Sequence, residues 1–253
     1  MNRNQQLEKL IKELSPTTKI PIDISEKWRL FRALVNRREP KPVTAEFIKI
    51  QDELLKSLIA ESGITDIDEL HPIRENLYLW RGDITTLKVD AIVNAANSSM
   101  LGCFVPCHAC IDNAIHTFAG VQIRTKCSEI MQKQDYPEPT GQAKVTEAYN
   151  LPSKYILHTV GPIINSVVHD KDKQLLSSCY RSCLELAEQH KLSSVAFCCI
   201  STGEFRFPNE EAAVIAVNTV SDWLKTSQYV KRMVFNVFTD KDQRIYESLL
   251  GQH

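Results

Sequence analysis

The sequence predicts an α/β protein with a mostly parallel sheet, preceded by a small all-helical segment. Between residues 5 and 60 the apolar side chains recur at the spacing of amphipathic helices, whereas after Pro72 short apolar runs alternate with helical stretches. Strands that alternate with helices form parallel sheets covered on both faces. We therefore divide the chain into a helical N-terminal extension, residues 1–70, and an α/β domain, residues 71–253.

Periodicity and turn residues place the individual elements. Pro40 and Pro42 end one helix of the extension, and Thr44 is the expected N-cap of the next. In the α/β domain we expect strands over 77–80, 91–94, 143–148, 155–160, 195–200 and 232–238, and helices over 110–118, 122–133, 171–190, 209–226 and 241–250. Ligands of such sheets bind at the carboxyl ends of the strands, so the loops after those ends are the places to search for a site.

The composition is that of an ordinary globular protein and excludes several classes. The 253 residues carry 30 Lys and Arg against 31 Asp and Glu, and 43% are hydrophobic. A net charge of −1 argues against long nucleic acid as a partner, because counterion-release binding needs a basic face. No run approaches the ~20 apolar residues of a bilayer-spanning helix, so no membrane partner is expected. The polar N-terminus predicts a cytoplasmic protein whose eight cysteines stay reduced.

The loop after the second predicted strand is rich in potential metal ligands. Cys103, Cys107, His108 and Cys110 fall within eight positions. Zinc accepts thiolate and imidazole ligands, and three protein ligands with an open position are the catalytic arrangement. The alternative is that these cysteines are small apolar fillers of a buried loop. Spacing alone leaves both interpretations open.

The loop after the fifth predicted strand, Ser201 to Pro208, leads directly into a helix. Small residues let backbone N–H groups converge on one point, and a helix N-terminus adds partial positive charge, which together suit a phosphate. Taken alone, the loop is explained better as an ordinary strand-to-helix turn.

Five segments in order resemble the motifs of macrodomains, the ADP-ribose-binding modules: residues 81–85, 89–97, 112–116, 157–162 and 201–208. After Asn-Ala-Ala-Asn, the chain carries Gly-Cys-Phe-x-Pro-x-His-x-Cys-Ile-Asp-Asn in place of a glycine-rich stretch. That pattern resembles the zinc-dependent subfamily, microbial protein-ADP-ribose hydrolases with a helical N-terminal extension. The resemblance implies a three-layer α/β/α fold around a mixed, mostly parallel sheet. It also implies one zinc ion per chain, held by Cys103, His108 and Cys110.

The resemblance further implies catalytic roles for Asn97 and Asp112, with Asn97 on the distal ribose. Asp83 would bind the adenine amino group and Phe238, ending the last strand, would stack on the base. The complete set of implied ADP-ribose contacts is Asp83, Ile84, Asn97, Cys110, Ile111, Asp112, Asn113, Ser201, Thr202, Gly203, Glu204, Phe205 and Phe238. Simpler interpretations remain, since Asp83 and Asp112 also suit helix caps and Phe238 suits the core.

Three positions in these loops fit the family pattern less well. Cys107 occupies a variable position and is given no role. Glu204 and Arg206 stand where small or apolar residues are more usual. A carboxylate beside a diphosphate is unfavourable unless it faces the distal ribose or a metal-bound water, so Glu204 is a secondary candidate base. Arg206 either faces solvent or clamps phosphate.

The other cysteines and histidines have simpler interpretations. Cys179 and Cys183 on a helix, and Cys198 and Cys199 in a strand, are expected in the core. His158 is expected to be buried with its hydrogen bonds satisfied. His116 lies one helical turn from Asp112, which would bring it near the site, but core packing is the simpler expectation.

The function implied by the resemblance is a zinc-dependent, glycosidase-type hydrolase that removes mono-ADP-ribose from Asp or Glu side chains of proteins. Zinc would orient the distal ribose or activate water. The alternative is a non-catalytic ADP-ribose reader, or a module that binds or deacetylates O-acetyl-ADP-ribose. A reader needs no metal with an open position, so the Cys-His-Cys loop favours the enzyme. The implied partners are mono-ADP-ribosylated proteins, a sirtuin-like ADP-ribosyltransferase and a lipoyl-carrier substrate protein.

Overall fold

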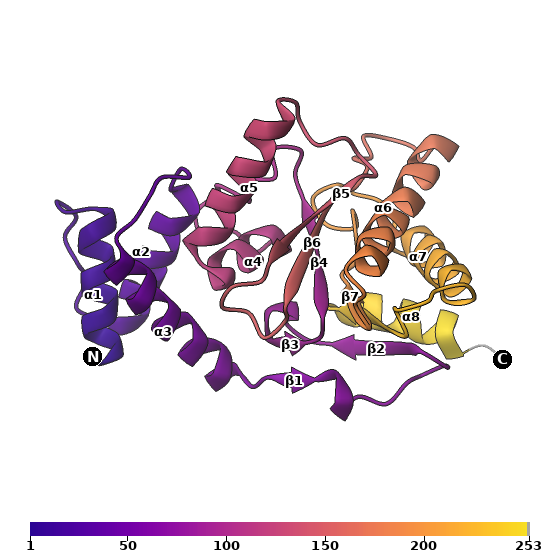
Figure 1. The fold of residues 1–253 in the computed structure, drawn as a ribbon, viewed down its shortest axis with the longest axis horizontal. Helices are drawn as coiled ribbons and strands as arrows, with labels where there is room; N and C mark the ends of the chain where they lie inside the picture. The colour runs from indigo at the N-terminus through magenta and orange to yellow at the C-terminus, as the bar shows by residue number, and fades with distance from the viewer. Residues whose placement is uncertain (252–253) are drawn as a thin grey trace.

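The structure, a computed structural model, describes residues 1–251 and confirms the α/β class. Three helices form the extension: α1 (Arg3–Leu14), α2 (Ile24–Arg37) and α3 (Ala45–Ser62). Five more flank the sheet: α4 (Ile111–Ala119), α5 (Val121–Gln134), α6 (Asp170–Gln189), α7 (Asn209–Leu224) and α8 (Asp240–Gly251). Helices α4 and α5 lie on the side of the sheet that faces the extension, and α6, α7 and α8 lie on the other side (Figure 1).

The main sheet has the order β2-β8-β7-β4-β6-β5. Its strands are β2 (Leu77–Arg81), β4 (Ala91–Ala96), β5 (Ala143–Glu147), β6 (Tyr155–Val160), β7 (Ser194–Phe197) and β8 (Arg232–Val237). Every pair is parallel except β5 with β6, so the sheet is mixed and mostly parallel, as expected. The central strand β4 pairs with both β6 and β7.

Short elements at the edge of the domain were absent from the sequence prediction. They are β1 (Thr65–Asp66), β3 (Leu87–Lys88) and the 3-10 helices η1 (Ile67–Glu69) and η2 (Ile84–Thr86). Elements of two or three residues are too short to produce a periodic apolar pattern.

Three predicted strands were too long, of which β5 ends at Glu147, one residue before its predicted end. Strand β7 ends at Phe197 rather than at residue 200, and β8 ends at Val237, so Phe238 follows the strand instead of ending it. Cys198 and Ile200 are nevertheless buried, which explains why the apolar run continues after strand pairing has stopped. An apolar run reports burial, not hydrogen bonding, so it overestimates strand length here.

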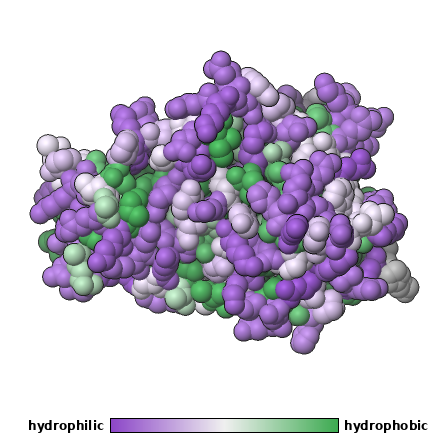
Figure 2. Space-filling model, in the orientation of Figure 1, coloured by the Kyte–Doolittle hydropathy of each residue, from purple (hydrophilic) through white to green (hydrophobic). Residues whose placement is uncertain are grey.

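The surface of the molecule is mostly polar. Figure 2 shows hydrophilic side chains over most of this face, with apolar side chains in separate patches. Among residues 1–251, no helix has both the length and the apolar character that crossing a bilayer requires.

The N-terminal extension packs against the α/β domain through a shared apolar core. The buried members of this core are Leu7, Leu10, Ile11, Phe31, Val35, Phe47, Ile50, Leu54, Leu55 and, from α5, Val121. Trp28 of α2 and Phe118 of α4 lie with their ring centroids 5.9 Å apart. Thr44 caps α3 as expected, because its hydroxyl accepts a hydrogen bond from the Phe47 N–H at 3.0 Å.

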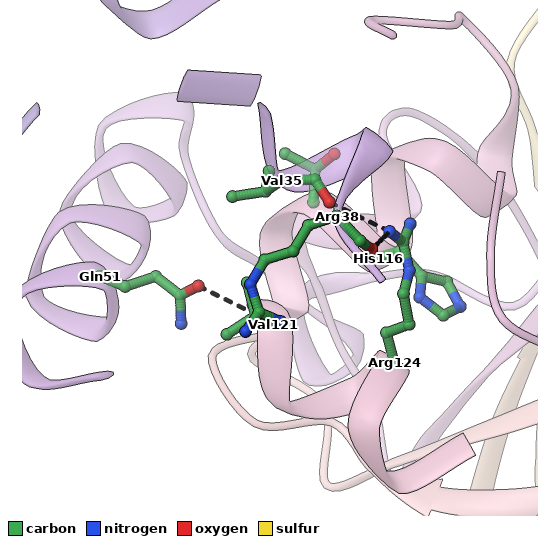
Figure 3. A pocket seen from close by; sticks show the side chains of 8 residues that line it. Val35, Arg38, Gln51, His116, Val121 and Arg124 are labelled. Carbon is green, nitrogen blue, oxygen red and sulfur yellow. Dashed lines mark hydrogen bonds between the residues drawn. The ribbon is translucent and has the colours of Figure 1, made fainter. Parts of the chain in front are cut away.

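Polar contacts continue along this seam (Figure 3). The side-chain oxygen of Gln51 accepts a hydrogen bond from the Val121 N–H at 3.0 Å. Arg124 of α5 donates to the carbonyl oxygens of Val35 and Asn36 at 3.1 and 2.8 Å, and also to that of Arg38. These carbonyls end α2, where a cation is favoured by the helix dipole. Helix α2 is therefore tied to α5 at its carboxyl end.

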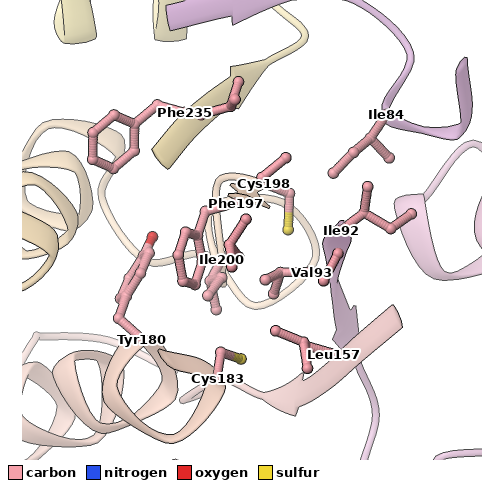
Figure 4. Close-up of a cluster of buried hydrophobic side chains, with 14 of the residues drawn as sticks. Ile84, Ile92, Val93, Leu157, Tyr180, Cys183, Phe197, Cys198, Ile200 and Phe235 are labelled. Atoms are coloured by element: carbon pink, nitrogen blue, oxygen red, sulfur yellow. The ribbon is translucent and has the colours of Figure 1, made fainter. Parts of the chain in front are cut away.

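The main core lies on both faces of the sheet. Figure 4 shows part of it, where side chains from β4, β6, β7 and β8 meet the helices. Tyr180 of α6 and Phe197 of β7 pack with ring centroids 4.9 Å apart. Cys179, Cys183 and Cys198 are buried in this core, as expected, and all eight cysteines are free.

Asp90 joins the starts of three parallel strands. Its carboxylate accepts hydrogen bonds from the backbone N–H groups of Ser193 and Ser194, at 2.8 and 3.1 Å, and from Lys154 Nζ at 2.7 Å. Its own carbonyl oxygen accepts from the N–H groups of Lys154 and Tyr155. Partial burial raises the pKa of Asp90, but the bonds from Lys154 and Ser193 outweigh it and lower the pKa to about 2.

We expect Asp90→Asn to lower the free energy of unfolding at pH 7 by about 1 kcal/mol, a value reduced for solvent screening. Because the folded-state pKa is depressed, the carboxylate stabilises the fold above its unfolded pKa of ~3.9 and loses this effect as the pH falls to about 2. Urea unfolding of both proteins between pH 2 and 7 measures the difference. Asp135→Asn, at an ordinary helix end, is the control. A difference that is the same at pH 2 and pH 7 would contradict this account.

Candidate active site

A cavity of about 530 Å³ opens at the carboxyl ends of the parallel strands, where the topology predicts a ligand site. Its lining includes seven of the expected contact residues: Asp83, Ile84, Cys110, Ile111, Thr202, Gly203 and Phe238. It also includes residues that the sequence analysis did not select: Gly82, Ala109, Ala114, Cys198, Cys199, Asn209, Asn236, Thr239, Lys241 and Asp242. The loops after β2, β7 and β8 and the start of α4 supply most of the lining.

One end of the cavity lies between β2 and β8. Asp83 caps η2, and its Oδ1 accepts hydrogen bonds from the Thr85 N–H at 2.9 Å and the Thr85 hydroxyl at 2.7 Å. Phe238 is 73% exposed, so it is not part of the core and its ring is free to contact a ligand. The floor nearby is polar, since Asp242 accepts hydrogen bonds from Asn209 and Thr239. Such polar residues after strand ends carry no periodic signal in a sequence.

The three expected metal ligands come together at the other end. The ligand atoms of Cys103, His108 and Cys110 lie within 4.8 Å of one another, and all three residues are half-buried. Cys103 Sγ and His108 Nδ1 are 3.7 Å apart. Cys110 is the N-cap of α4, and its sulfur accepts a hydrogen bond from the Asn113 N–H at 3.4 Å. The start of α4 therefore fixes the position of the Cys110 sulfur, one of the three expected ligand atoms.

The surroundings of Cys110 disfavour its thiolate when no cation is beside it. Burial, together with the charge of the neighbouring Cys103 and Asp112, raises the pKa of the Cys110 thiol to about 12, although the Asn113 N–H opposes this shift. A thiolate at this position is costly until a positive charge is placed beside it. A soft divalent cation bound to both sulfurs would remove that cost.

Asp112 lies immediately behind the ligand cluster in a buried polar network. Its Oδ1 accepts a hydrogen bond from Asn94 Nδ2 at 2.9 Å, and its Oδ2 accepts one from Asn97 Nδ2 at 3.3 Å. Burial raises the pKa of Asp112 to about 6, while the Asn94 bond and the charge of Arg124 oppose the shift. The side chain is thus a buried carboxyl group whose pKa is moved towards neutral pH. Asp112 does not cap α4, because Cys110 does.

His116 contacts this carboxyl group, and His158 binds its partner Asn94. His116 Nε2 is 3.5 Å from Asp112 Oδ1, and burial lowers the pKa of His116 well below its usual value. The ring also lies against Gly102, where an added Cβ would come within 2.6 Å of it. His158 is buried with both ring nitrogens hydrogen-bonded, to Asn94 at 3.1 Å and Thr146 at 2.9 Å, which confirms the expectation for this residue.

Asn97 and Asn113 shape the loop that carries the cluster. Asn97 accepts a hydrogen bond from the Ser99 N–H at 3.0 Å and donates to the Gly102 carbonyl at 3.1 Å. Asn113 is fully buried, and its Nδ2 donates to the Val105 carbonyl at 3.0 Å. Its side chain contacts the loop, and Asn113 is not among the residues that line the cavity.

The Ser201 to Pro208 loop is wound tightly beside the cluster. Ser201 and Arg206 adopt left-handed backbone conformations, with φ of +66° and +59°. The Phe207 N–H closes the loop on the Ser201 carbonyl at 2.9 Å, and the Phe205 carbonyl accepts from the Ile164 N–H at 2.8 Å. Gly161 allows the close approach of this loop, because a Cβ there would lie 1.9 Å from Ser201 Oγ.

Glu204 extends from this loop towards the Cys-His-Cys cluster. Its Oε1 lies 3.6 Å from His108 Nε2, while its side chain remains 73% exposed. The carboxylate therefore faces a cluster residue, on the nitrogen opposite the one nearest Cys103. A carboxylate on the second nitrogen of a metal-binding histidine orients the ring and raises its basicity.

Comparison with known proteins finds a matching family and similar proteins. A Macro domain family model matches residues 93–216. A protein-ADP-ribose hydrolase from Treponema medium is 55% identical over 92% of this chain and 90% of its own length. One from Staphylococcus aureus strain MSSA476 is 52% identical over 92% of this chain and 88% of its own.

Solved structures show the same fold with ligands. The Oceanobacillus iheyensis macrodomain with ADP is 39% identical, has a TM-score of 0.64, and matches 72% of this chain and 93% of its own. The Trypanosoma brucei macrodomain with ADP-ribose is 29% identical, has a TM-score of 0.67, and matches 87% of this chain and 95% of its own. The identity shared with the curated relatives, the strand order and the cavity at the strand ends show that this chain belongs to the macro domain family.

Proposed function

We propose that the protein is a zinc-dependent hydrolase that removes mono-ADP-ribose from Asp or Glu side chains of modified proteins. The observation that carries this proposal is the convergence of Cys103, His108 and Cys110 within 4.8 Å at the end of the ligand cavity. Relatives at 52% and 55% identity that are named protein-ADP-ribose hydrolases support the hydrolysis. The macrodomain structures with ADP and ADP-ribose support the ligand.

The three residues suit zinc as a ligand set. Two sulfurs and one imidazole nitrogen are the atoms that zinc prefers, and three protein ligands leave a position for substrate or water. The half-buried cluster is reached from the cavity, because Cys110 belongs to both. When bound, zinc supplies a Lewis acid that polarises an oxygen of the substrate or lowers the pKa of water.

In the proposed binding mode, ADP-ribose lies along the cavity with the adenine at one end and the distal ribose at the other. Adenine binds between Asp83, Ile84 and the exposed ring of Phe238, and the diphosphate lies along Thr202 and Gly203. The distal ribose then reaches Cys110 and Ile111, next to Asn97 and Asp112. This direction places the bond to the protein side chain beside the ligand cluster, at the end opposite the adenine.

Cleavage separates the distal ribose C1 from the carboxylate oxygen of the modified residue and builds positive charge on the ribose. Asn97 fixes a ribose hydroxyl, and Asp112, held by Asn94 and Asn97, orients the groups next to it. Glu204 is the exposed carboxylate nearest the cluster and is the candidate to accept a proton from the attacking water. We place this reaction in the cytoplasm, where the free cysteines remain reduced.

We expect Cys110→Ala to lower kcat at least 100-fold, because removal of one thiolate from a three-ligand site releases the metal. The measurement is release of labelled ADP-ribose from a glutamate-linked mono-ADP-ribosylated protein, with enzyme as purified, after chelation, and after zinc is restored. Cys107→Ser is the matched control, since the Cys107 sulfur faces the Arg29 carbonyl at 3.4 Å, outside the cluster. Tight ADP-ribose binding without turnover in every metal condition would contradict the proposal and indicate a reader.

We expect Phe238→Ala to weaken ADP-ribose binding about tenfold, because stacking of a base on an aromatic ring contributes ~1–3 kcal/mol. The melting temperature should stay within about 1 °C, since the 73% exposed ring packs little against the protein. Isothermal titration calorimetry measures the affinity. Tyr136→Ala, which removes a 60% exposed ring outside the cavity, is the control. Equal affinities for the two variants would place adenine elsewhere.

A further inference from the structure

We propose that helix α2 of the N-terminal extension positions the Cys-His-Cys loop through Arg32 and Asn36. The inference rests on the proposed function in one respect, that the loop binds the metal used in the reaction. Arg32 and Asn36 are four residues apart and therefore lie on one face of the helix, one turn from each other. Asn36 accepts a hydrogen bond from the Cys107 N–H, and Arg32 donates one to the His108 carbonyl. These two groups flank the peptide bond between Cys107 and His108.

Arg32 holds the loop at the histidine. Its Nη2 donates to the His108 carbonyl at 3.0 Å and to Asn113 Oδ1 at 2.8 Å. Asn113 in turn donates to the Val105 carbonyl at 3.0 Å and follows the third ligand, Cys110, by one helical turn. A single guanidinium group thus connects the backbone of one expected ligand to the helix start that presents another.

Asn36 holds Cys107, the residue before His108. It is 1% exposed, and its Oδ1 accepts a hydrogen bond from the Cys107 N–H at 2.9 Å, while its Nδ2 donates to Thr117 Oγ1 at 2.9 Å. Cys107 has a φ of +54°, a left-handed conformation that is unfavourable for a non-glycine residue. The hydrogen bond from the Cys107 N–H to Asn36 stabilises that conformation, which turns the chain so that His108 faces the two cysteines.

The loop has little hydrogen bonding of its own. Among the described residues 103–110, one backbone hydrogen bond joins two residues of the loop, from the His108 N–H to the Val105 carbonyl at 3.3 Å. A segment without regular structure keeps one geometry only when outside contacts impose it. Arg32, Asn36 and Asn113 supply those contacts, and Arg124 adds a cation over the Phe104 ring at 4.2 Å.

Helix α2 is itself well anchored for this role. The Arg124 guanidinium binds the carbonyl groups at its carboxyl end, and Phe31 and Val35 are buried in the core that the extension shares with α5. Arg32 and Asn36 therefore extend from a rigid support. Partners behind a metal ligand commonly change metal affinity by 10- to 100-fold when they are removed.

We expect Arg32→Met to raise the dissociation constant for zinc at least tenfold, because the His108 carbonyl and Asn113 lose their shared donor. Competition against a chromogenic chelator measures this constant. kcat should fall while the KM and the ADP-ribose affinity of the metal-free protein stay within about twofold. Arg32→Lys, which keeps a cationic donor, should recover part of the loss. Arg37→Met, an exposed position on the same helix, is the control.

A second measurement needs neither metal nor turnover. Amide hydrogen exchange over residues 103–110 of the metal-free protein should be faster in Arg32→Met than in Arg37→Met, with exchange in the sheet unchanged. If Arg32→Met does not fold, Arg32→Gln takes its place with the same expectations. Zinc affinity and loop exchange equal to those of Arg37→Met would overturn the positioning role. Absence of turnover in a zinc-loaded wild-type protein would overturn the proposed hydrolase instead, and would leave the comparison of zinc affinities valid.

Discussion

The position of β4 at the centre of the parallel sheet is the constraint on which the site depends. Because β4 pairs with β6 on one side and β7 on the other, the loops that leave these strands emerge side by side at the same edge. The loop after β4 that carries Cys103, His108 and Cys110 thereby meets the Ser201 to Pro208 loop after β7, and Glu204 comes to lie opposite His108. Asp90 aligns the starts of β4, β6 and β7 at the opposite edge of the sheet.

Burial at the site shifts the pKa values of neighbouring groups in opposite directions. It raises the pKa of Asp112 and of the Cys110 thiol and lowers the pKa of His116. All three shifts favour the neutral form of the group concerned. Glu204, by contrast, is 73% exposed.

The sequence was most informative where burial and chemistry repeat in a regular pattern. Alternating apolar runs revealed all six strands of the main sheet. The density of Cys and His pointed to the loop, and the macrodomain resemblance selected the three residues that the structure brings together. The two-residue strands are too short to give a periodic pattern, and the end of β7 at Phe197 was not predictable because burial continues after strand pairing stops. The end of β8 at Val237 was missed because Phe238 is apolar but exposed. The cavity residues Asn209 and Asp242 were missed because isolated polar residues have no period. Arg32 lies 76 positions from His108, a separation that no local pattern bridges.

The core shared by the extension and the domain has a consequence for modularity. Val121 of α5 is buried among the side chains of α1, α2 and α3, and Phe118 packs against both cores. A truncation that removed the three helices would uncover these apolar side chains and leave the Arg124 guanidinium without its carbonyl acceptors. Fusions or domain exchanges that cut between the extension and the α/β domain would therefore separate apolar surfaces that pack against each other.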